Sequence, residues 1–232
     1  MKRLIITADE FGLSPGINRA INESVQRGVV TNTALIITGQ HFTDAVLWCQ
    51  QNPAIGTGIY LDLDEFFFVD REKETVKFYW GDTIPLGKII HSVQEQIRQY
   101  LATGLPCDFV ASKYNVHLLP ELFPYICTLC RVNGIKSIRY IRKFYQTNYP
   151  ELAPEWLDKF IADNSLITTE HFIKGWYFGN LDSYQDGTAE LTTRPGNFPP
   201  EREEELRICT DPEVKQYINS SGIQLITYRN LS

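Results

Sequence analysis

Short apolar segments alternate with segments of helical character along most of this chain, and this alternation restricts its fold more than any other feature. Residues 3–8, RLIITA, are typical of a buried strand. Residues 15–28 are typical of a helix, because Ser14 can cap its start and Pro15 suits its first turn. A strand followed by a helix and another strand predicts parallel strands with helical crossovers. The sequence therefore predicts an α/β fold.

The same pattern extends over the rest of the chain. Further strands are expected at 33–38, 55–63, 108–112, 136–141, the start of 188–196, and 223–228. Further helices are expected at 43–51, 86–103, 121–132, 154–164, 201–209 and 212–220. Residues 64–84, which are aromatic and charged, are expected to form a long loop or lid. We find no repeat, low-complexity tract or linker, so residues 1–232 are expected to form one domain, at a length ordinary for an α/β barrel.

Composition excludes several classes of partner. The net charge is −6 and no block of lysine and arginine occurs, which argues against nucleic acid and anionic membranes. The apolar stretch within residues 1–10 is too short for a signal peptide, and no segment is long enough to span a bilayer. Five cysteines, an odd number, do not form a disulfide framework. These features predict a cytoplasmic protein.

Cys127 and Cys130 form a C-x-x-C pair, which raises the question of a zinc or redox site. No second cysteine pair and no histidine pair stands at ligand spacing. The surrounding segment ELFPYICTLCRVNG has helical periodicity and ends in Asn133 and Gly134, which suit a helix C-terminus. We therefore expect both thiols to pack in the core.

Polar residues follow the predicted strands, and two adjacent acids, Asp9 and Glu10, end the first one. Carboxylates at the end of a buried strand must be solvated, paired with cations or bound to a metal. In folds with parallel strands the chemistry lies at the carboxyl ends. Read in order, these ends carry Asp9, Glu10, Tyr60, Asp62, Ser112, Lys113, Asn115, His117, Arg139, Arg142 and Arg194. The set predicts a functional cleft.

Six segments in order along the chain resemble the sequence blocks of the YdjC-like carbohydrate deacetylases, a family that includes the chitooligosaccharide deacetylases. They are ITADEFGLSPGINRAI, GVVTNTALIITG, GTGIYLDL, DFVASKYNVHLLPELFP, AELTTRPG and DPEVKQYINSSGIQLITYRNL. The resemblance runs from about Arg3 to Leu231. It implies a single irregular (β/α) barrel, an N-acetylated sugar as substrate and one divalent metal in the cleft. It also implies hydrolysis by a metal-bound water that an aspartate base activates, with a histidine acting later.

The residues at the family's functional positions differ from the family pattern. Asp9 matches the aspartate base, and Glu10 replaces the second aspartate, a metal ligand. Tyr60 and Lys113 stand where the family has histidine ligands. Arg194 replaces the histidine that closes the family's site. Only the first of these five positions keeps the family's residue.

The motif around Lys113 is altered further. Ala111 replaces an aspartate, Asn115 replaces a histidine, and His117 alone remains of the cluster. A neutral tyrosine is a poor ligand, and a lysine ammonium has no lone pair for a metal. At about 4 Å and an effective dielectric constant of about 20, a cation would repel a dication by roughly 8 kcal/mol. We therefore expect cations to hold Asp9 and Glu10, with Lys113 in place of the metal.

Three hypotheses follow. In the first, the cleft binds a sugar or related polar metabolite but lacks the metal and the deacetylase reaction. In the second, an active hydrolase keeps a displaced Mg or Zn on Glu10, Asp62 or His117. In the third, a metal-free enzyme uses Lys113 beside Tyr60 as a base or Schiff-base nucleophile. The predicted catalytic residues are Asp9, Arg194 and Lys113, and the predicted substrate-binding residues are Tyr60, Asp62, Asn115, His117 and Arg139. A homodimer and a monomer both remain open.

Overall fold

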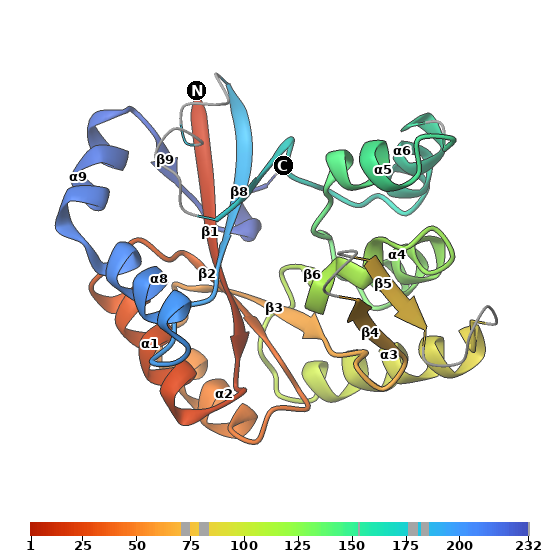
Figure 1. The fold of residues 1–232 in the computed structure, drawn as a ribbon, viewed down its shortest axis with the longest axis horizontal. Helices are drawn as coiled ribbons and strands as arrows, with labels where there is room; N and C mark the ends of the chain where they lie inside the picture. The colour runs from red at the N-terminus through yellow and green to blue at the C-terminus, as the bar shows by residue number, and fades with distance from the viewer. Residues whose placement is uncertain (71–74, 79–83, 153, 176–180, 182–185, 232) are drawn as a thin grey trace.

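The computed structural model describes residues 1–70, 75–78, 84–152, 154–175, 181 and 186–231. It contains a curled parallel sheet with helices around its outer side (Figure 1). In chain order the elements are β1 (Lys2–Phe11), α1 (Pro15–Gln26), β2 (Asn32–Leu35), α2 (Phe42–Gln51), β3 (Gly56–Leu61), β4 (Phe67–Asp70), β5 (Thr75–Phe78), α3 (Leu86–Leu101), β6 (Val110–Ser112), η1 (Lys113–Leu118), α4 (Phe123–Val132), α5 (Arg142–Asn148), α6 (Pro154–Asp163), β7 (His171–Lys174), β8 (Gly187–Thr193), α8 (Pro200–Thr210), α9 (Pro212–Ser220), β9 (Gln224–Leu225) and η2 (Tyr228–Asn230). No helix among these residues is long and apolar enough to cross a membrane.

The sheet is built around β1. The strand order is β6-β3-β2-β1-β8-β7, neighbouring strands are parallel, and β9 pairs with the start of β1. Two isolated parallel bridges, Val110 to Ile138 and Ser137 to Ile167, extend the sheet beyond β6. Because Ile167 shortly precedes β7, the chain there passes from one edge of the sheet toward the other. The sheet therefore curls into the irregular (β/α) barrel that the sequence predicts.

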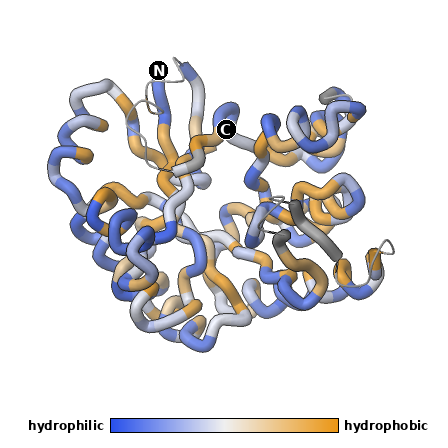
Figure 2. The backbone as a smooth tube through the Cα atoms, viewed as in Figure 1, coloured by the Kyte–Doolittle hydropathy of each residue, from blue (hydrophilic) through white to orange (hydrophobic). Residues whose placement is uncertain are grey.

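Alternate residues of β1 face opposite sides of the sheet, as in any strand. Leu4, Ile6 and Ala8 pack into the main core, which also contains the buried residues of the helices. Ile5 belongs to a second, smaller cluster on the inner face, and Thr7 forms a hydrogen bond there. Figure 2 shows hydrophobic segments along the strands and hydrophilic ones at the periphery. The helices thus cover the outer face, and the inner face is left to hold polar groups.

The C-terminal segment packs against the inner face near the start of β1. The Tyr228 ring stacks on the Phe109 ring with centroids 4.2 Å apart and planes 12° apart. The amide of Ile226 donates a hydrogen bond of 3.0 Å to the carbonyl of Leu4. This end of the barrel is therefore filled by apolar side chains, which leaves the polar site to the carboxyl ends of the strands.

Most of the predicted elements are confirmed, but four segments differ. The predicted loop 64–84 contains an antiparallel hairpin, β4 with β5, in which Phe67 pairs with Phe78; residues 71–74 and 79–83 lie outside the described part. The predicted strand 136–141 forms only single bridges. Helix α5 and strand β7 were not predicted. In each case the element is short, so neighbouring chain segments decide its conformation more than its own residues do.

The cysteines behave as the sequence predicts. Cys127 and Cys130 lie in α4, are buried in the main core and form no disulfide. Burial raises the pKa of the Cys127 thiol to about 12, so it stays protonated and unreactive. The C-x-x-C pair therefore contributes to packing.

We expect Gly58→Ala to destabilise the protein by about 1–3 kcal/mol, because overpacking a tight interior forces its neighbours to move. A Cβ at Gly58 would lie 2.4 Å from the Phe109 ring, which the stack with Tyr228 holds in place. Gly87→Ala is the matched control, since a Cβ in this helical position meets no atom within 4 Å. Urea unfolding of both variants measures the effect. Equal stability of the two would contradict this account of the interior.

Candidate functional site

The carboxyl ends of the strands carry the main predicted site residues. Asp9 lies near the end of β1 and Tyr60 near the end of β3, while Lys113 directly follows β6 and Arg194 directly follows β8. The register between β1 and β8 runs up to Ala8, so Arg194 lies level with Asp9. Because parallel strands end at one edge of the sheet, these residues share one end of the barrel.

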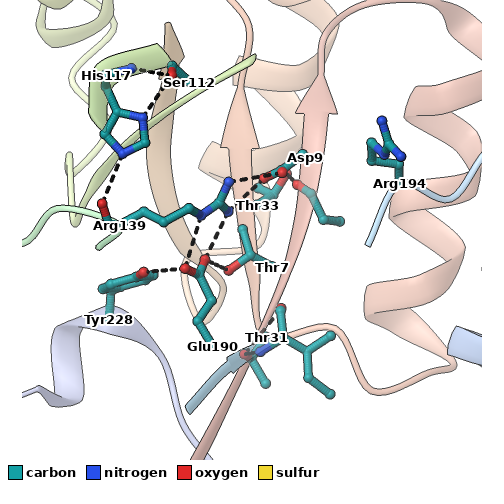
Figure 3. A network of polar contacts seen from close by, with 12 residues as sticks. Thr7, Asp9, Thr31, Thr33, Ser112, His117, Arg139, Glu190, Arg194 and Tyr228 are labelled. Atoms are coloured by element: carbon teal, nitrogen blue, oxygen red, sulfur yellow. Dashed lines mark hydrogen bonds and ion pairs between the residues drawn. The ribbon is translucent and has the colours of Figure 1, made fainter. Parts of the chain in front are cut away.

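The centre of the site is a buried guanidinium held between two carboxylates (Figure 3). Arg139 donates to both oxygens of Asp9, at 3.0 and 2.9 Å, and to both oxygens of Glu190, at 3.0 and 2.9 Å. The Arg139 side chain is 1% exposed and that of Glu190 is 0% exposed. Such bidentate, charge-assisted pairs fix both distance and orientation. The arrangement therefore holds the Asp9 carboxylate rigidly.

Two hydroxyl groups complete the environment of Glu190. Thr7 donates to one carboxylate oxygen and Tyr228 to the other, each at 2.7 Å. Asp9, Arg139, Glu190, Thr7 and Tyr228 are called the Asp9 network below. It joins β1, the segment after Ile138, β8 and the C-terminal η2 on the inner face of the barrel.

The Asp9 network contains one more carboxylate than guanidinium. Burial raises the pKa of Asp9 to about 6, and the negative charges of Glu190 and Glu10 add to this. The charge and hydrogen bonds of Arg139 act in the opposite direction but do not cancel the effect. The proton affinity of Asp9 is therefore set mainly by the loss of solvent around it.

His117 holds the backbone of Arg139 in place and so supports the Asp9 network. Its Nε2 lies 2.9 Å from the carbonyl oxygen of Arg139, which can only accept, so Nε2 carries the proton. Its Nδ1 lies 2.7 Å from the Ser112 hydroxyl, which donates to it. Burial lowers the pKa of His117 to about 3, so the ring is neutral. Both ring nitrogens are engaged, and neither is available to a ligand or a metal.

Glu10 is held by a second arginine. Its carboxylate pairs with the guanidinium of Arg202, which comes from the first turn of α8. Glu10 is 4% exposed and has a φ of 70°, a left-handed conformation that is unusual for a residue with a side chain. The family's second carboxylate position is thus neutralised by a guanidinium.

Lys113 does not take the place that the sequence predicts for it. Its ammonium pairs with Asp64, and both side chains are partly exposed. Burial lowers the pKa of Lys113, but the hydrogen bond and charge of Asp64 raise it more, so the pKa is raised overall and the amine is protonated. The expectation that Lys113 holds Asp9 and Glu10 is wrong, because arginines from more distant segments reach these carboxylates.

Tyr60 and Arg194 lie beside the two carboxylates. Tyr60 is 5% exposed, and burial followed by the charges of Asp9 and Glu10 raises the pKa of its phenol well above the usual value. Arg194 lies close enough to oppose this rise. Its side chain is exposed and stands apart from the Asp9 network in Figure 3. These two residues give the site a neutral hydroxyl and a solvated cation.

The other predicted residues are distributed around the same end. Asp62 accepts a hydrogen bond of 2.6 Å from the Thr38 hydroxyl and lines a cavity between β3 and α3. Asn115, with a φ of 55°, lines a different cavity beside α5. Arg139, which was expected to contact a substrate, is instead buried and positions Asp9. Asp62, Asn115 and Arg139, which were predicted to bind one substrate, therefore lie in three different places.

Sequence reasoning missed three important residues. Glu190 is the single acid in the strand segment TAELTT, and an acid at an inward position of a buried strand could have indicated a partner. Arg202 lies in the charged segment EREEELR, where nothing distinguishes it from a solvated residue. Tyr228 was expected only to end an apolar strand, so nothing in the sequence indicated its hydrogen bond to Glu190. Their roles depend on contacts between distant segments.

The residues at the family's metal position do not fit a divalent ion. The carboxylate of Glu10, at a ligand position, pairs with the guanidinium of Arg202, and both oxygens of Asp9, at the neighbouring base position, bind Arg139. The phenol of Tyr60 is neutral and the amine of Lys113 is protonated. Within the described residues, no group of three His, Cys, Asp or Glu side chains could hold a metal. We therefore assign no reaction step to a metal in this chain.

A family model described as YdjC-like protein matches residues 3–220. The chain belongs to the YdjC-like family. A carbohydrate deacetylase of Brevibacillus brevis is 27% identical, with 99% of each chain covered. A chitooligosaccharide deacetylase of Yersinia enterocolitica is 27% identical, with 98% of each chain covered.

The fold of this YdjC-like protein also matches a solved structure. A putative cellobiose-phosphate cleavage protein from Enterococcus faecalis V583 superimposes with a TM-score of 0.77, at 24% identity and 98% coverage of both chains. This similarity supports the barrel architecture. The implied family and the implied fold are thus both confirmed.

We expect Arg139→Met to destabilise the protein by about 3–5 kcal/mol, because it leaves two buried carboxylates without their cation. Lys113→Met should cost less than about 1 kcal/mol, because its pair with Asp64 is partly exposed. Chemical denaturation of both variants gives the comparison. A larger loss of stability from Lys113→Met than from Arg139→Met would contradict this account and indicate that Lys113 holds the carboxylates.

The stability of the native protein should fall between about pH 4 and pH 6 relative to that of Asp9→Asn. A carboxyl with a pKa of about 6 when folded, against 3.8 as its ordinary value, binds a proton more tightly in the folded state. Its stabilisation is complete below the unfolded pKa and is lost as the pH rises through the folded pKa. The full difference is about 3 kcal/mol, since one pKa unit corresponds to about 1.4 kcal/mol.

Denaturation of both proteins at several pH values tests this. The free energy of unfolding of the native protein is compared with that of Asp9→Asn. A difference that stays constant or rises with pH would show that the charge of Arg139 outweighs burial in setting the pKa of Asp9.

Proposed function

We propose that this YdjC-like protein binds a sugar or related polar metabolite, without the divalent metal and the metal-dependent deacetylation that the family resemblance implies. One observation carries the proposal: an arginine neutralises each of the two carboxylates at the family's base and metal positions. A metal at the family's ligand position would have to displace Arg202 from Glu10. The Arg202 guanidinium, only 17% exposed, would then lose its charged partner and lie close to the dication, which is unfavourable.

The names of two relatives support a sugar as the class of ligand. Two relatives that align with nearly the whole chain are a carbohydrate deacetylase and a chitooligosaccharide deacetylase. A cleft of the same barrel type can hold a sugar without a metal, because sugar hydroxyls are recognised by hydrogen bonds and by aromatic faces. The buried Tyr60 hydroxyl and the exposed Arg194 guanidinium are suitable donors at the strand ends.

The two alternative hypotheses receive less support. A displaced metal on Glu10, Asp62 or His117 would have to break existing pairs, since both nitrogens of His117 are already engaged. A Schiff-base enzyme needs an unprotonated amine. The pKa of Lys113 is instead raised by its pairing with Asp64. No observation favours either alternative over the proposal.

We expect titration calorimetry with zinc to detect no saturable binding to the native protein. The triple variant Glu10→Asp, Tyr60→His and Lys113→His should bind zinc, because it restores the family's ligand types at the same strand ends. The shorter aspartate side chain of Glu10→Asp also places the carboxylate farther from Arg202. Equal zinc binding by the native and triple-variant proteins would contradict the proposal.

A second measurement completes the test. Native protein incubated with tri-N-acetylchitotriose should bind the sugar but release no acetate, with or without added zinc. Release of acetate that EDTA abolishes would show that the native cleft works with a metal.

A further inference from the structure

Residues 223–231 lie at the barrel end where β1 begins, and they are called the C-terminal clasp below. Strand β8 pairs along one edge of β1, whereas β2 reaches the other edge only from Thr7 onward. Strand β9 fills the part of that edge that β2 leaves open. The amide of Ile226 then donates a hydrogen bond of 3.0 Å to the carbonyl of Leu4. The clasp is therefore attached to the central strand of the sheet.

Arg229 attaches the clasp to two other segments. Its Nε donates to both oxygens of Asp108, at 2.9 and 2.8 Å. Its Nη1 and Nη2 donate to the carbonyls of Pro53 and Ile55, at 2.8 and 2.7 Å. Charge-assisted bonds from all three nitrogens of one planar group fix its orientation as well as its distance. Asp108 also accepts a hydrogen bond of 2.8 Å from the amide of Thr57, so this attachment extends to β3.

Tyr228 lies between these two attachments, which restrict the direction of its side chain. Its ring is 2% exposed and stacks on the ring of Phe109, the residue after Asp108. Its hydroxyl donates a hydrogen bond of 2.7 Å to Glu190 (Figure 3). Burial, followed by the charge of Glu190, raises the pKa of this phenol well above its usual value, so the hydroxyl keeps its proton. The clasp therefore contributes one oriented hydrogen bond to the Asp9 network.

Glu190 transfers this orientation to the guanidinium of Arg139. Its Oε1 accepts from Thr7 and from Nη2 of Arg139, and its Oε2 accepts from Tyr228 and from Nε of Arg139. Because a bidentate pair of planar groups fixes their relative orientation, the plane of this carboxylate sets that of the guanidinium. The same Nη2 donates to Asp9 at 2.9 Å, and Nη1 donates to it at 3.0 Å. A rotation of Glu190 would therefore move the group that holds Asp9.

We propose that the C-terminal clasp positions the carboxylate of Asp9 from the opposite end of the barrel. Tyr228 is the positioning residue, which acts through Glu190 and Arg139, and Arg229 holds Tyr228 in place. The geometry of the strand-end site then depends on a segment at the far end of the sequence. This inference goes beyond the proposed function, because it concerns the protein's own geometry and requires no particular ligand.

Nuclear magnetic resonance of the full-length, isotope-labelled protein tests the proposal through the guanidinium N–H signals of Arg139, which Arg139→Lys identifies by their loss. Tyr228→Phe keeps the ring on Phe109 and removes only the hydroxyl. We expect it to shift these signals and to accelerate their exchange with solvent by about tenfold, the effect of one hydrogen bond to a charged group. Tyr125→Phe is the matched control and should change neither quantity, because Tyr125 is 45% exposed on α4, outside the Asp9 network.

A second variant tests whether the clasp holds Tyr228 in place. Arg229→Lys keeps the charge but loses the planar group that binds two carbonyls and a carboxylate. We expect it to shift the Arg139 signals in the native background but not in the Tyr228→Phe background, because the effect passes through the hydroxyl. Asp108→Asn weakens the same attachment and replaces Arg229→Lys if that variant does not fold.

Arg207→Lys is the matched control for the arginine substitution. Arg207 forms a pair through two nitrogens with Glu204, and both side chains are exposed on α8. Its replacement should leave the Arg139 signals unchanged in both backgrounds.

Thermal unfolding of the same variants identifies a clasp that only packs. Lower midpoints for Tyr228→Phe and Arg229→Lys with unchanged Arg139 signals would overturn the proposal. Equal shifts from Arg229→Lys in both backgrounds would also overturn it, because the effect would not pass through Tyr228. Neither measurement uses a ligand, so these results would leave the proposed function intact. Failure of the native protein to bind a sugar would likewise leave the role of the clasp intact.

Discussion

The interior of the barrel depends on the ion pairs of one buried guanidinium. Arg139 has lost nearly all contact with solvent, and a charge in that position is tolerated only with charged partners at hydrogen-bond distance. Asp9 and Glu190 provide them from two neighbouring strands. Tyr228, beyond the segment that matches the family model, binds one of these carboxylates. Four segments far apart in sequence are thereby joined in one network.

The same pairing changes what the cleft can do. A divalent ion offers open coordination positions and makes a bound water acidic, whereas a guanidinium only donates hydrogen bonds along fixed directions. Asp9 keeps the family's residue, but both of its oxygens are directed to Arg139. Glu10 is occupied in the same way by Arg202. Under the proposed function, the site keeps the barrel of its family and recognises its ligand without a metal.

The polar groups around Arg139 are hydrogen-bonded to one another. In the Asp9 network every oxygen of Glu190 is satisfied, and His117 uses both ring nitrogens.

The sequence by itself determined the alternation of strands and helices, which depends on local periodicity, and the family, which its sequence blocks resemble. It placed Asp9, Tyr60 and Arg194 at one end of the barrel through the rule that parallel strands end together. It also predicted that cations would hold the carboxylates. Only the tertiary structure decided which cations: Arg139 and Arg202 reach them, because side-chain pairing across the barrel depends on distances that no local pattern encodes.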